Sequence, residues 1–248
     1  MRLSPAVRYA GARALRAAAT PRGALSWFRD RADYAALPGA EPLRWRDSFP
    51  KLTDRVESSP FDPHYFHQDT WAARRIAERR PARHVDVGSR VDLVGFLTAI
   101  TQVVFVDIRP LEVDIEGLEP VAGSVLDLPF ADGTLESVSC LHVAEHIGLG
   151  RYGDPLDPLG TRKAAAELKR VLAPGGQLLF SLPVGRPRVE FNAHRVHDPH
   201  EVASWFSGLE LAEFAGVDDA GVFRRHRSLG ELAGASYACG MYQLVASP

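Results

Sequence analysis

The sequence predicts an α/β fold in which helices cover both faces of a mostly parallel, seven-stranded sheet. From residue 83 onward, apolar segments of strand length alternate with segments of helix length, as in sheets with helical crossovers. The first strand ends in Asp86 and precedes Gly88, and the second ends in Asp107, 21 residues after Asp86. This layout indicates a nucleotide-cofactor site, where Gly88 permits close approach and Asp107 accepts hydrogen bonds from ribose hydroxyls.

The order of elements follows from the hydrophobic pattern and from the proline, glycine and capping residues between the apolar segments. Strands are expected near residues 83–87, 102–107, 120–123, 136–141, 177–182, 209–217 and 240–246. Helices are expected near residues 69–79, 91–100, 161–172 and 199–207. Pro174-Gly175-Gly176 should stop the third helix, and Asp198-Pro199 should start the fourth as N-cap and first-turn proline. After Asp107, the next element follows so soon that a crossover helix should be short or missing.

The N-terminal part of the chain has a different composition. Residues 1–29 contain six arginines and no acidic residue, and five prolines follow between residues 38 and 63. We therefore expect a basic extension and proline-rich connector over residues 1–69 and one domain over residues 70–248. A transit peptide or membrane-surface helix is an alternative for the basic segment. The weak apolar face of Ala6–Ala19 favours a solvated helix that packs loosely on the domain.

Composition narrows the function classes. The chain has 248 residues, 46% hydrophobic content and a formal net charge of −2, which gives no general electrostatic case for nucleic acid as a partner. No apolar run reaches the roughly 18 residues of a transmembrane helix. Two cysteines provide neither a disulfide framework nor a thiolate metal site. These features predict a cytoplasmic protein. The partner expected from the motifs described below is a small-molecule or glycan substrate, and a homodimer is compatible with the sequence.

The glycine pattern after the first strand departs from the known fingerprints. A dinucleotide site needs glycines at alternate positions, but Arg90 stands at the second of them. A methyltransferase pattern of the form D-x-G-x-G-x-G fits Asp86 and Gly88 and then departs at Arg90 and Asp92. The first motif alone therefore leaves the cofactor open.

Later motifs carry a resemblance to a known superfamily. Leu128-Pro129-Phe130 with Asp132-Gly133, then Glu145-His146, then Glu167 to Gly176 occur in the order found in class I S-adenosylmethionine-dependent methyltransferases. The chain resembles this superfamily over about residues 70 to 246, which implies a Rossmann-like fold and S-adenosylmethionine as cofactor. Within it, Cys140 to Asp154 and Phe191 to His197 resemble a little-characterised methyltransferase-like domain of unknown function. That narrower resemblance implies a link with polysaccharide pathways.

The resemblance implies roles for individual residues. Asp86, Gly88 and Ser89 would line the methionine end of the cofactor, Asp107 would hold the ribose, and Ile108 would pack on the adenine. The other implied cofactor positions are Ser124, Val125, Leu126 and His142. Ser124 stands where the superfamily usually has an acid, which is a third departure beside Arg90 and Asp92.

Histidines gather after two of the expected strands. His142-Val-Ala-Glu145-His146 has the spacing of inverted zinc peptidases, but that motif requires a helix, and here it begins at a strand end. Small-RNA 3′-terminal ribose methyltransferases, which hold a divalent ion with a similar run, are a better comparison. By this resemblance, the metal hypothesis assigns the ligands His142, Glu145, His146, His194 and His197. The alternative is that Glu145 and His146 stabilise the loop without a metal.

A long loop, residues 148–160, should contact the substrate. Its turn-rich composition places Arg151, Tyr152 and Asp154 at the rim of the predicted crevice, and Asn192 and Arg195 should join them. Arginine forks bind phosphate or carboxylate, and tyrosine stacks on sugar faces. His142, His146 and Tyr152 are the candidate catalytic groups.

Three functions compete. The first is O-methylation of a sugar, nucleotide sugar or related hydroxylated metabolite, with His142 or His146 as general base or a metal that activates the hydroxyl. The second is a repurposed binding or scaffold protein, in which Arg90 occupies or pairs within the cofactor site. The third is a metal-dependent enzyme of another reaction class on the same scaffold.

Overall fold

The computed structural model describes residues 21–248, so the expected helix Ala6–Ala19 lies outside the described residues. The chain divides into two compact units on either side of the Phe61–Asp62 bond. In the first unit, residues 21–35 are helical and a 3-10 turn, η1, spans Trp45–Asp47. The rings of Trp27, Phe28 and Trp45 pack together, with centroids 5.1 to 6.2 Å apart. None of residues 21–61 is buried, so this unit has no core of its own.

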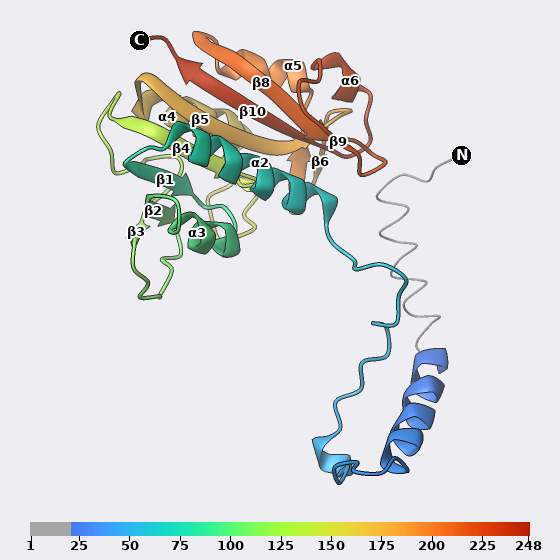
Figure 1. Ribbon diagram of the computed structural model, residues 1–248. Coiled ribbons are helices and arrows are strands. Elements are labelled where there is room, and N and C mark those ends of the chain that lie inside the picture. The colour runs from blue at the N-terminus through green and yellow to red at the C-terminus, as the bar shows by residue number, and fades with distance from the viewer. Residues whose placement is uncertain (1–20) are drawn as a thin grey trace. The chain divides into compact units, whose positions relative to one another are not determined.

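The second unit is built on an eight-stranded sheet with the order β3-β2-β1-β4-β5-β10-β8-β9 (Figure 1). Strands β1 to β5 run parallel, and β10 is antiparallel to both β5 and β8. The strands of this sheet are β1 (Arg83–Val87), β2 (Gln102–Asp107), β3 (Leu118–Ala122), β4 (Leu135–Leu141), β5 (Leu172–Val184), β8 (Leu209–Val217), β9 (Phe223–Arg224) and β10 (Ala238–Ala246). The seven predicted strands are all present, and two-residue β9 adds an eighth at one edge.

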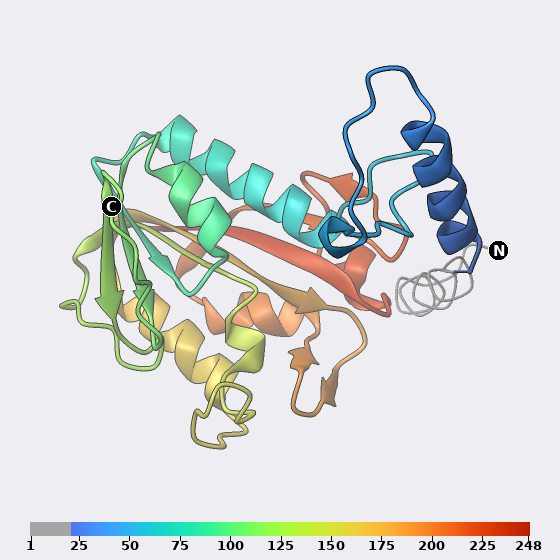
Figure 2. The ribbon, with the colours of Figure 1, turned by 90° about the horizontal axis from the view of Figure 1, so that it is seen from below.

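Helices cover both faces of this sheet, as the sequence predicted (Figure 2). The elements outside the sheet are α2 (Pro63–Arg79), α3 (Val91–Leu97), η2 (Ala144–His146), α4 (Gly160–Val171), α5 (Pro199–Trp205), α6 (Gly230–Ala233) and the hairpin of β6 (Arg188–Glu190) and β7 (His194–Val196). Two apolar clusters result: Trp71 and Leu97 belong to the cluster under α2 and α3, and Leu168 and Phe206 to the cluster under α4 and α5.

Several element boundaries differ from the expectation, and the two largest differences are at the starts of α2 and β5. Helix α2 begins at Pro63 and not near residue 69, because Asp62 caps it by accepting hydrogen bonds from the His64 and Tyr65 amides. Strand β5 begins at Leu172, directly after α4, so Pro174-Gly175-Gly176 lies inside the strand at a register shift. The Asp198-Pro199 start of α5 is confirmed, and residues 108–117 contain no helix.

Among the described helices, none combines the length and hydropathy needed to span a bilayer.

Candidate functional site

A cavity opens at the carboxyl ends of the parallel strands. The strand order reverses between β1 and β4, the place where open α/β sheets bind ligands. The cavity has a volume of about 350 Å³ and is lined by residues of β1, β2, the turn after β3, η2 and the loop 148–160. We call the part around Gly88 and Asp107 the glycine end, and the part around His142, Glu145 and His146 the histidine end.

Gly88 shapes the glycine end. Its φ is +69°, and a Cβ there would meet Val143 Cγ1 at 3.1 Å, so a side chain would be strained and crowded. Asp86 lies fully buried beneath it, where its carboxylate accepts hydrogen bonds from the Ser89 amide, at 3.0 Å, and the Ser139 hydroxyl. Burial raises the pKa of Asp86 to about 6. Asp86 and Ser89, both predicted to touch a cofactor, are outside the cavity lining and instead set the conformation of the turn.

Asp107 ends β2 and faces the cavity with 15% of its side chain exposed. One carboxylate oxygen accepts a hydrogen bond from the Arg109 amide at 2.7 Å, which orients the group. Ile108 and Leu126 add apolar surface at 47% and 37% exposure, and Ser124 and Val125 complete this wall. A carboxylate beside accessible apolar side chains suits a ribose joined to an adenine ring.

The loop 148–160 forms the rim of the cavity through Tyr152, Gly153, Asp154 and Pro155. The Tyr152 ring lies beneath the Arg109 guanidinium at 4.4 Å and near that of Arg151 at 5.1 Å. Arg109 was missed by the sequence analysis, because its pairing with Tyr152 joins residues of distant segments. The Asp154 carboxylate accepts hydrogen bonds from the Gly148 and Tyr152 amides, so it braces the loop.

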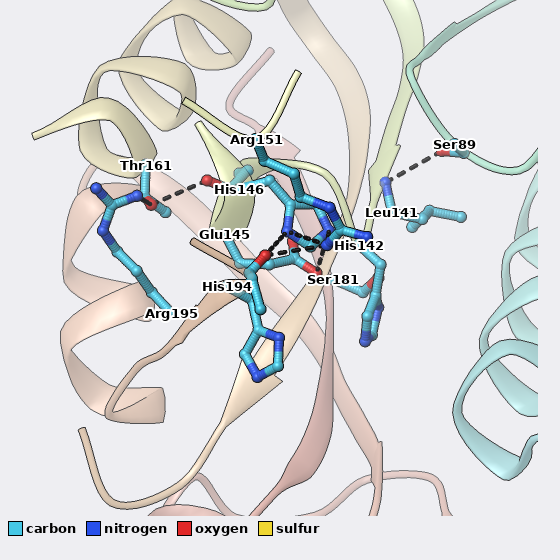
Figure 3. A network of polar contacts seen from close by, with 12 residues as sticks. Ser89, Leu141, His142, Glu145, His146, Arg151, Thr161, Ser181, His194 and Arg195 are labelled. Carbon is cyan, nitrogen blue, oxygen red and sulfur yellow. Dashed lines mark hydrogen bonds and ion pairs between the residues drawn. The ribbon is translucent and has the colours of Figure 1, made fainter. Parts of the chain in front are cut away.

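Arg195, predicted to bind substrate, holds this loop from below. It is 6% exposed and donates hydrogen bonds to the carbonyls of Ile147, at 2.6 Å, and Asp157, at 3.0 Å. Thr161 is a further partner on the same side (Figure 3). The Arg195 guanidinium therefore bonds to protein groups and not to a substrate. Asn192, the other predicted substrate contact, lies exposed in the turn between β6 and β7.

His142 follows β4 directly, with φ at +55°, and contributes to the cavity lining. Its Nδ1 hydrogen-bonds the side-chain oxygen of Gln68 from α2, while its buried Nε2 has no partner among the described residues. Burial holds the pKa of His142 well below its ordinary value. The imidazole is therefore neutral at neutral pH.

Glu145 and His146 lie in η2. Burial raises the pKa of Glu145 to about 8, so its carboxyl group is protonated at neutral pH. His146 Nδ1 donates to the Ala193 carbonyl at 2.6 Å, and burial lowers the pKa of His146 to about 4. Arg151 extends alongside His146 and donates to the same carbonyl (Figure 3). The histidine end therefore holds neutral groups where the sequence suggested metal ligands.

The predicted metal ligands do not assemble. Within residues 21–248, no group of three or more His, Cys, Asp or Glu side chains is placed to hold an ion. His194 pairs with Glu190 of β6, at 3.2 Å, and His197 packs edge-on against Trp205, so neither joins His142. The expectation that the two histidine clusters meet at one metal ion is not supported.

Arg90, expected to interfere with a cofactor, lies outside the cavity lining. Its guanidinium pairs with Asp92 at 2.7 Å and lies 5.1 Å from the Tyr65 ring. Arg90 therefore stands at the N-cap of α3 and its side chain does not fill the cavity.

Comparisons with known proteins agree with the fold. Residues 123–231 match a family model described as "Caenorhabditis protein of unknown function, DUF268". No curated protein matches the sequence. YcgJ from Bacillus subtilis has a TM-score of 0.53 at 15% identity, with 74% of this chain and 99% of that chain covered. The N-methyltransferase NodS from Bradyrhizobium japonicum, solved with S-adenosyl-L-homocysteine, has a TM-score of 0.50 at 15% identity, with coverage of 89% and 98%.

A third similar structure, the [4+2]-cyclase SpnF, has a TM-score of 0.51 at 13% identity and covers 72% of this chain and 80% of its own. The chain therefore has the fold of class I S-adenosylmethionine-dependent methyltransferases, as the sequence motifs implied. Proteins with different reactions in their names share this fold, so the reaction must be argued from the site.

Proposed function

We propose that the protein is an S-adenosylmethionine-dependent methyltransferase that methylates a hydroxyl group of a sugar, nucleotide sugar or related metabolite. The observation that carries the proposal is the open cavity that has Gly88 and Asp107 at one end and the neutral imidazole of His142 at the other. Bare backbone at Gly88 and a carboxylate at Asp107 fit the cofactor, with Ile108 and Leu126 for the adenine.

When bound near Gly88 and Asp107, S-adenosylmethionine would supply an electrophilic methyl group to the acceptor oxygen, and the acceptor hydroxyl would have to lose its proton. A base must receive that proton. His142 and His146 are both neutral at neutral pH, because burial lowers their pKa values, so each has a lone pair available. Arg109 and Tyr152, which line the cavity, favour a polar or anionic acceptor. The proposal includes no metal ion, because the expected ligands His146, His194 and His197 each contact a different protein group.

The alternative of a repurposed binding protein rested on Arg90 within the cofactor site. Arg90 pairs with Asp92 and is outside the cavity lining, which supports the methyltransferase proposal over this alternative.

Calorimetric titration of S-adenosylmethionine and S-adenosylhomocysteine into the full chain tests the proposal. Loss of the Asp107 carboxylate should weaken binding by roughly 10- to 100-fold, since a hydrogen bond to a charged group contributes about 1.5–3 kcal/mol. Asp107→Ala is the test variant and Asp114→Ala the matched control, because Asp114 is exposed in the loop that follows the same strand. No heat of binding in the wild-type protein would contradict the proposal.

A further inference from the structure

Gln68 of α2 is fully buried, although glutamine is a residue that usually stays in contact with solvent. It lies 74 residues from His142 and 113 residues from Ser181 in the sequence, yet its side chain contacts both. Buried amides are expected to satisfy their hydrogen-bonding groups, so the direction of each bond can be deduced.

The orientation of the Gln68 amide follows from its neighbour. Its nitrogen donates a hydrogen bond to the Asp69 carboxylate at 3.0 Å. The amide oxygen has no proton to donate, so it could not take the place of the nitrogen. The opposite orientation would place that oxygen against a carboxylate. The amide oxygen therefore faces His142 and also accepts a hydrogen bond from the Ser181 hydroxyl at 2.5 Å.

This orientation decides which nitrogen of His142 carries the proton. An amide oxygen can only accept, so Nδ1 of His142 must be the protonated nitrogen. In a neutral imidazole the other nitrogen then has the lone pair. That nitrogen, Nε2, is buried and has no hydrogen-bond partner among the described residues. A buried acceptor without a partner costs free energy, so such a group points to a ligand that completes it.

His146 offers a contrast within the same site. Its Nδ1 bonds a main-chain carbonyl, and its Nε2 lies 3.6 Å from Glu145 Oε1 and 3.5 Å from Arg151 Nη1. The His146 Nε2 is thus surrounded by protein groups. Of these two histidines, His142 is the one whose second nitrogen has no partner among the described residues and can accept a proton from another molecule.

We propose that Gln68, anchored by Asp69, is the positioning residue that holds His142 in the Nδ1–H tautomer, so that Nε2 receives the proton of the acceptor hydroxyl. This inference rests on the proposed function and selects between the two histidines named there. The O–H bond of the acceptor breaks and an N–H bond forms at Nε2, while Gln68 and Asp69 stay unchanged. Gln68 touches neither acceptor nor cofactor in this role, because it acts through the ring.

The tautomer can be observed without any ligand. In ¹⁵N NMR of the full chain with labelled histidine, a protonated and an unprotonated ring nitrogen have well-separated shifts, and His142→Gln assigns the signals. We expect Nδ1 protonated and Nε2 unprotonated in the wild-type protein. Gln68→Met should lose this pattern, since methionine has a similar shape but lacks the amide acceptor. Gln68→Glu keeps an acceptor and should retain it.

Gln177→Met is the matched control. Gln177 is also buried, at 2% exposure, and accepts a hydrogen bond from Gln243 at 2.9 Å between β5 and β10. This variant should leave the His142 signals unchanged. A protonated Nε2 in the wild-type protein, or an unchanged pattern in Gln68→Met, would overturn the inference.

S-adenosylhomocysteine affinity separates this inference from the proposed function. Gln68→Met should bind it within a few-fold of the wild-type affinity, because Gln68 is outside the cavity lining. If the wild-type protein shows the expected tautomer but does not bind S-adenosylhomocysteine, the proposed function fails and the proton-accepting role of Nε2 fails with it. If it binds S-adenosylhomocysteine but protonates Nε2, only the role of Gln68 and His142 fails.

Discussion

The two ends of the cavity are built in different ways. At the glycine end, the contacts with backbone amides are local: Asp86 accepts from the Ser89 amide three residues away, and Asp107 accepts from the Arg109 amide two residues away. The Ser139 hydroxyl, 53 residues from Asp86, adds one distant contact. At the histidine end, His142 depends on Gln68, 74 residues away, and His146 on Ala193, 47 residues away. Short motifs can therefore encode most contacts of the first end, whereas the contacts of the second join residues far apart in the sequence.

The chemistry of the two ends differs in the same way. Asp107 is oriented by the backbone and remains partly exposed, which suits a group that binds a polar ligand. Glu145 and His142 are buried. Burial raises the pKa of Glu145 and lowers the pKa of His142, so the neutral form of each is favoured. The carboxylate of Asp107 and the uncharged side chains of His142 and Glu145 thus give the two ends different chemical character. The following substitutions test each end separately.

Substitution of Gly88 by valine should have the largest effect at the glycine end. Gly88 has a positive φ, and the new side chain would press on Val143, so the turn must move out of its binding conformation. Backbone strain of about 1–3 kcal/mol corresponds to roughly a 10- to 100-fold loss of S-adenosylhomocysteine affinity. Calorimetry measures this loss.

Gly95→Ala is the control for that substitution. Gly95 lies within α3 and a Cβ there meets nothing within 4 Å, so alanine should stabilise the helix by about 0.5–1 kcal/mol and leave binding unchanged. Equal binding by Gly88→Val and wild type would show that the cofactor does not approach Gly88.

Arg195→Ala should be the next largest change and should loosen the rim of the histidine end. Two carbonyls and a hydroxyl would lose a buried charged donor, with an expected destabilisation of about 2–3 kcal/mol. Urea unfolding measures the loss, and hydrogen exchange should report faster opening of residues 148–160. Arg162→Ala removes an exposed ion pair with Glu201 and should cost less than about 1 kcal/mol. Equal effects of the two substitutions would contradict the role of Arg195 in holding the loop 148–160.

The buried carboxyl of Glu145 predicts a pH dependence of stability that substitution of this residue should reduce. Because burial raises its pKa to about 8, the folded protein binds this proton more tightly than the unfolded chain does. The contribution of Glu145 to stability is therefore full below about pH 4.5 and is lost as the pH rises toward 8. Thermal melting from pH 5 to 9 should show a shallower decline in Glu145→Gln than in the wild-type protein.

Glu136→Gln serves as the matched control for this pH series, because Glu136 is an exposed glutamate on β4. Its melting curve should run parallel to that of the wild-type protein. Parallel curves for Glu145→Gln as well would mean that Glu145 is ionised in the folded state.

Tyr152→Ala should have the smallest effect, since Tyr152 joins the two ends through contacts with Arg109 and Arg151. Loss of partly exposed cation–π contacts of about 0.5–1 kcal/mol corresponds to roughly a two- to fivefold loss of S-adenosylhomocysteine affinity. Tyr152→Phe keeps the ring and should bind as the wild-type protein does. If Tyr152→Phe binds S-adenosylhomocysteine as weakly as Tyr152→Ala does, the tyrosine hydroxyl and not the ring is responsible for the effect.

The sequence could predict the sheet because each strand has its own apolar pattern and turn signals. The early start of α2 was predictable in principle, since Asp62-Pro63 is the same signal as Asp198-Pro199, but the surrounding prolines suggested a connector. The sequence also placed Gly88 and Asp107 at the ends of neighbouring strands, and both line the cavity, while their role toward a cofactor stays a prediction. Gln68 and Arg109 could not be found, because their roles depend on side chains from distant elements.

The histidine cluster shows where pattern reasoning fails. His142, His146, His194 and His197 all follow carboxyl ends of strands, so proximity was expected. Placement at one edge of a sheet does not fix where each ring points, and the rings turn to Gln68, a main-chain carbonyl, Glu190 and Trp205. Ligand spacing in sequence was therefore insufficient to predict a metal site.

A crystal structure of the full chain with S-adenosylhomocysteine would test the central claim most directly. We predict that the ribose hydroxyls contact the Asp107 carboxylate, that the adenine lies against Ile108 and Leu126, and that the sulfur lies toward His142. A ligand bound elsewhere, or one with its sulfur directed away from the histidine end, would contradict the account.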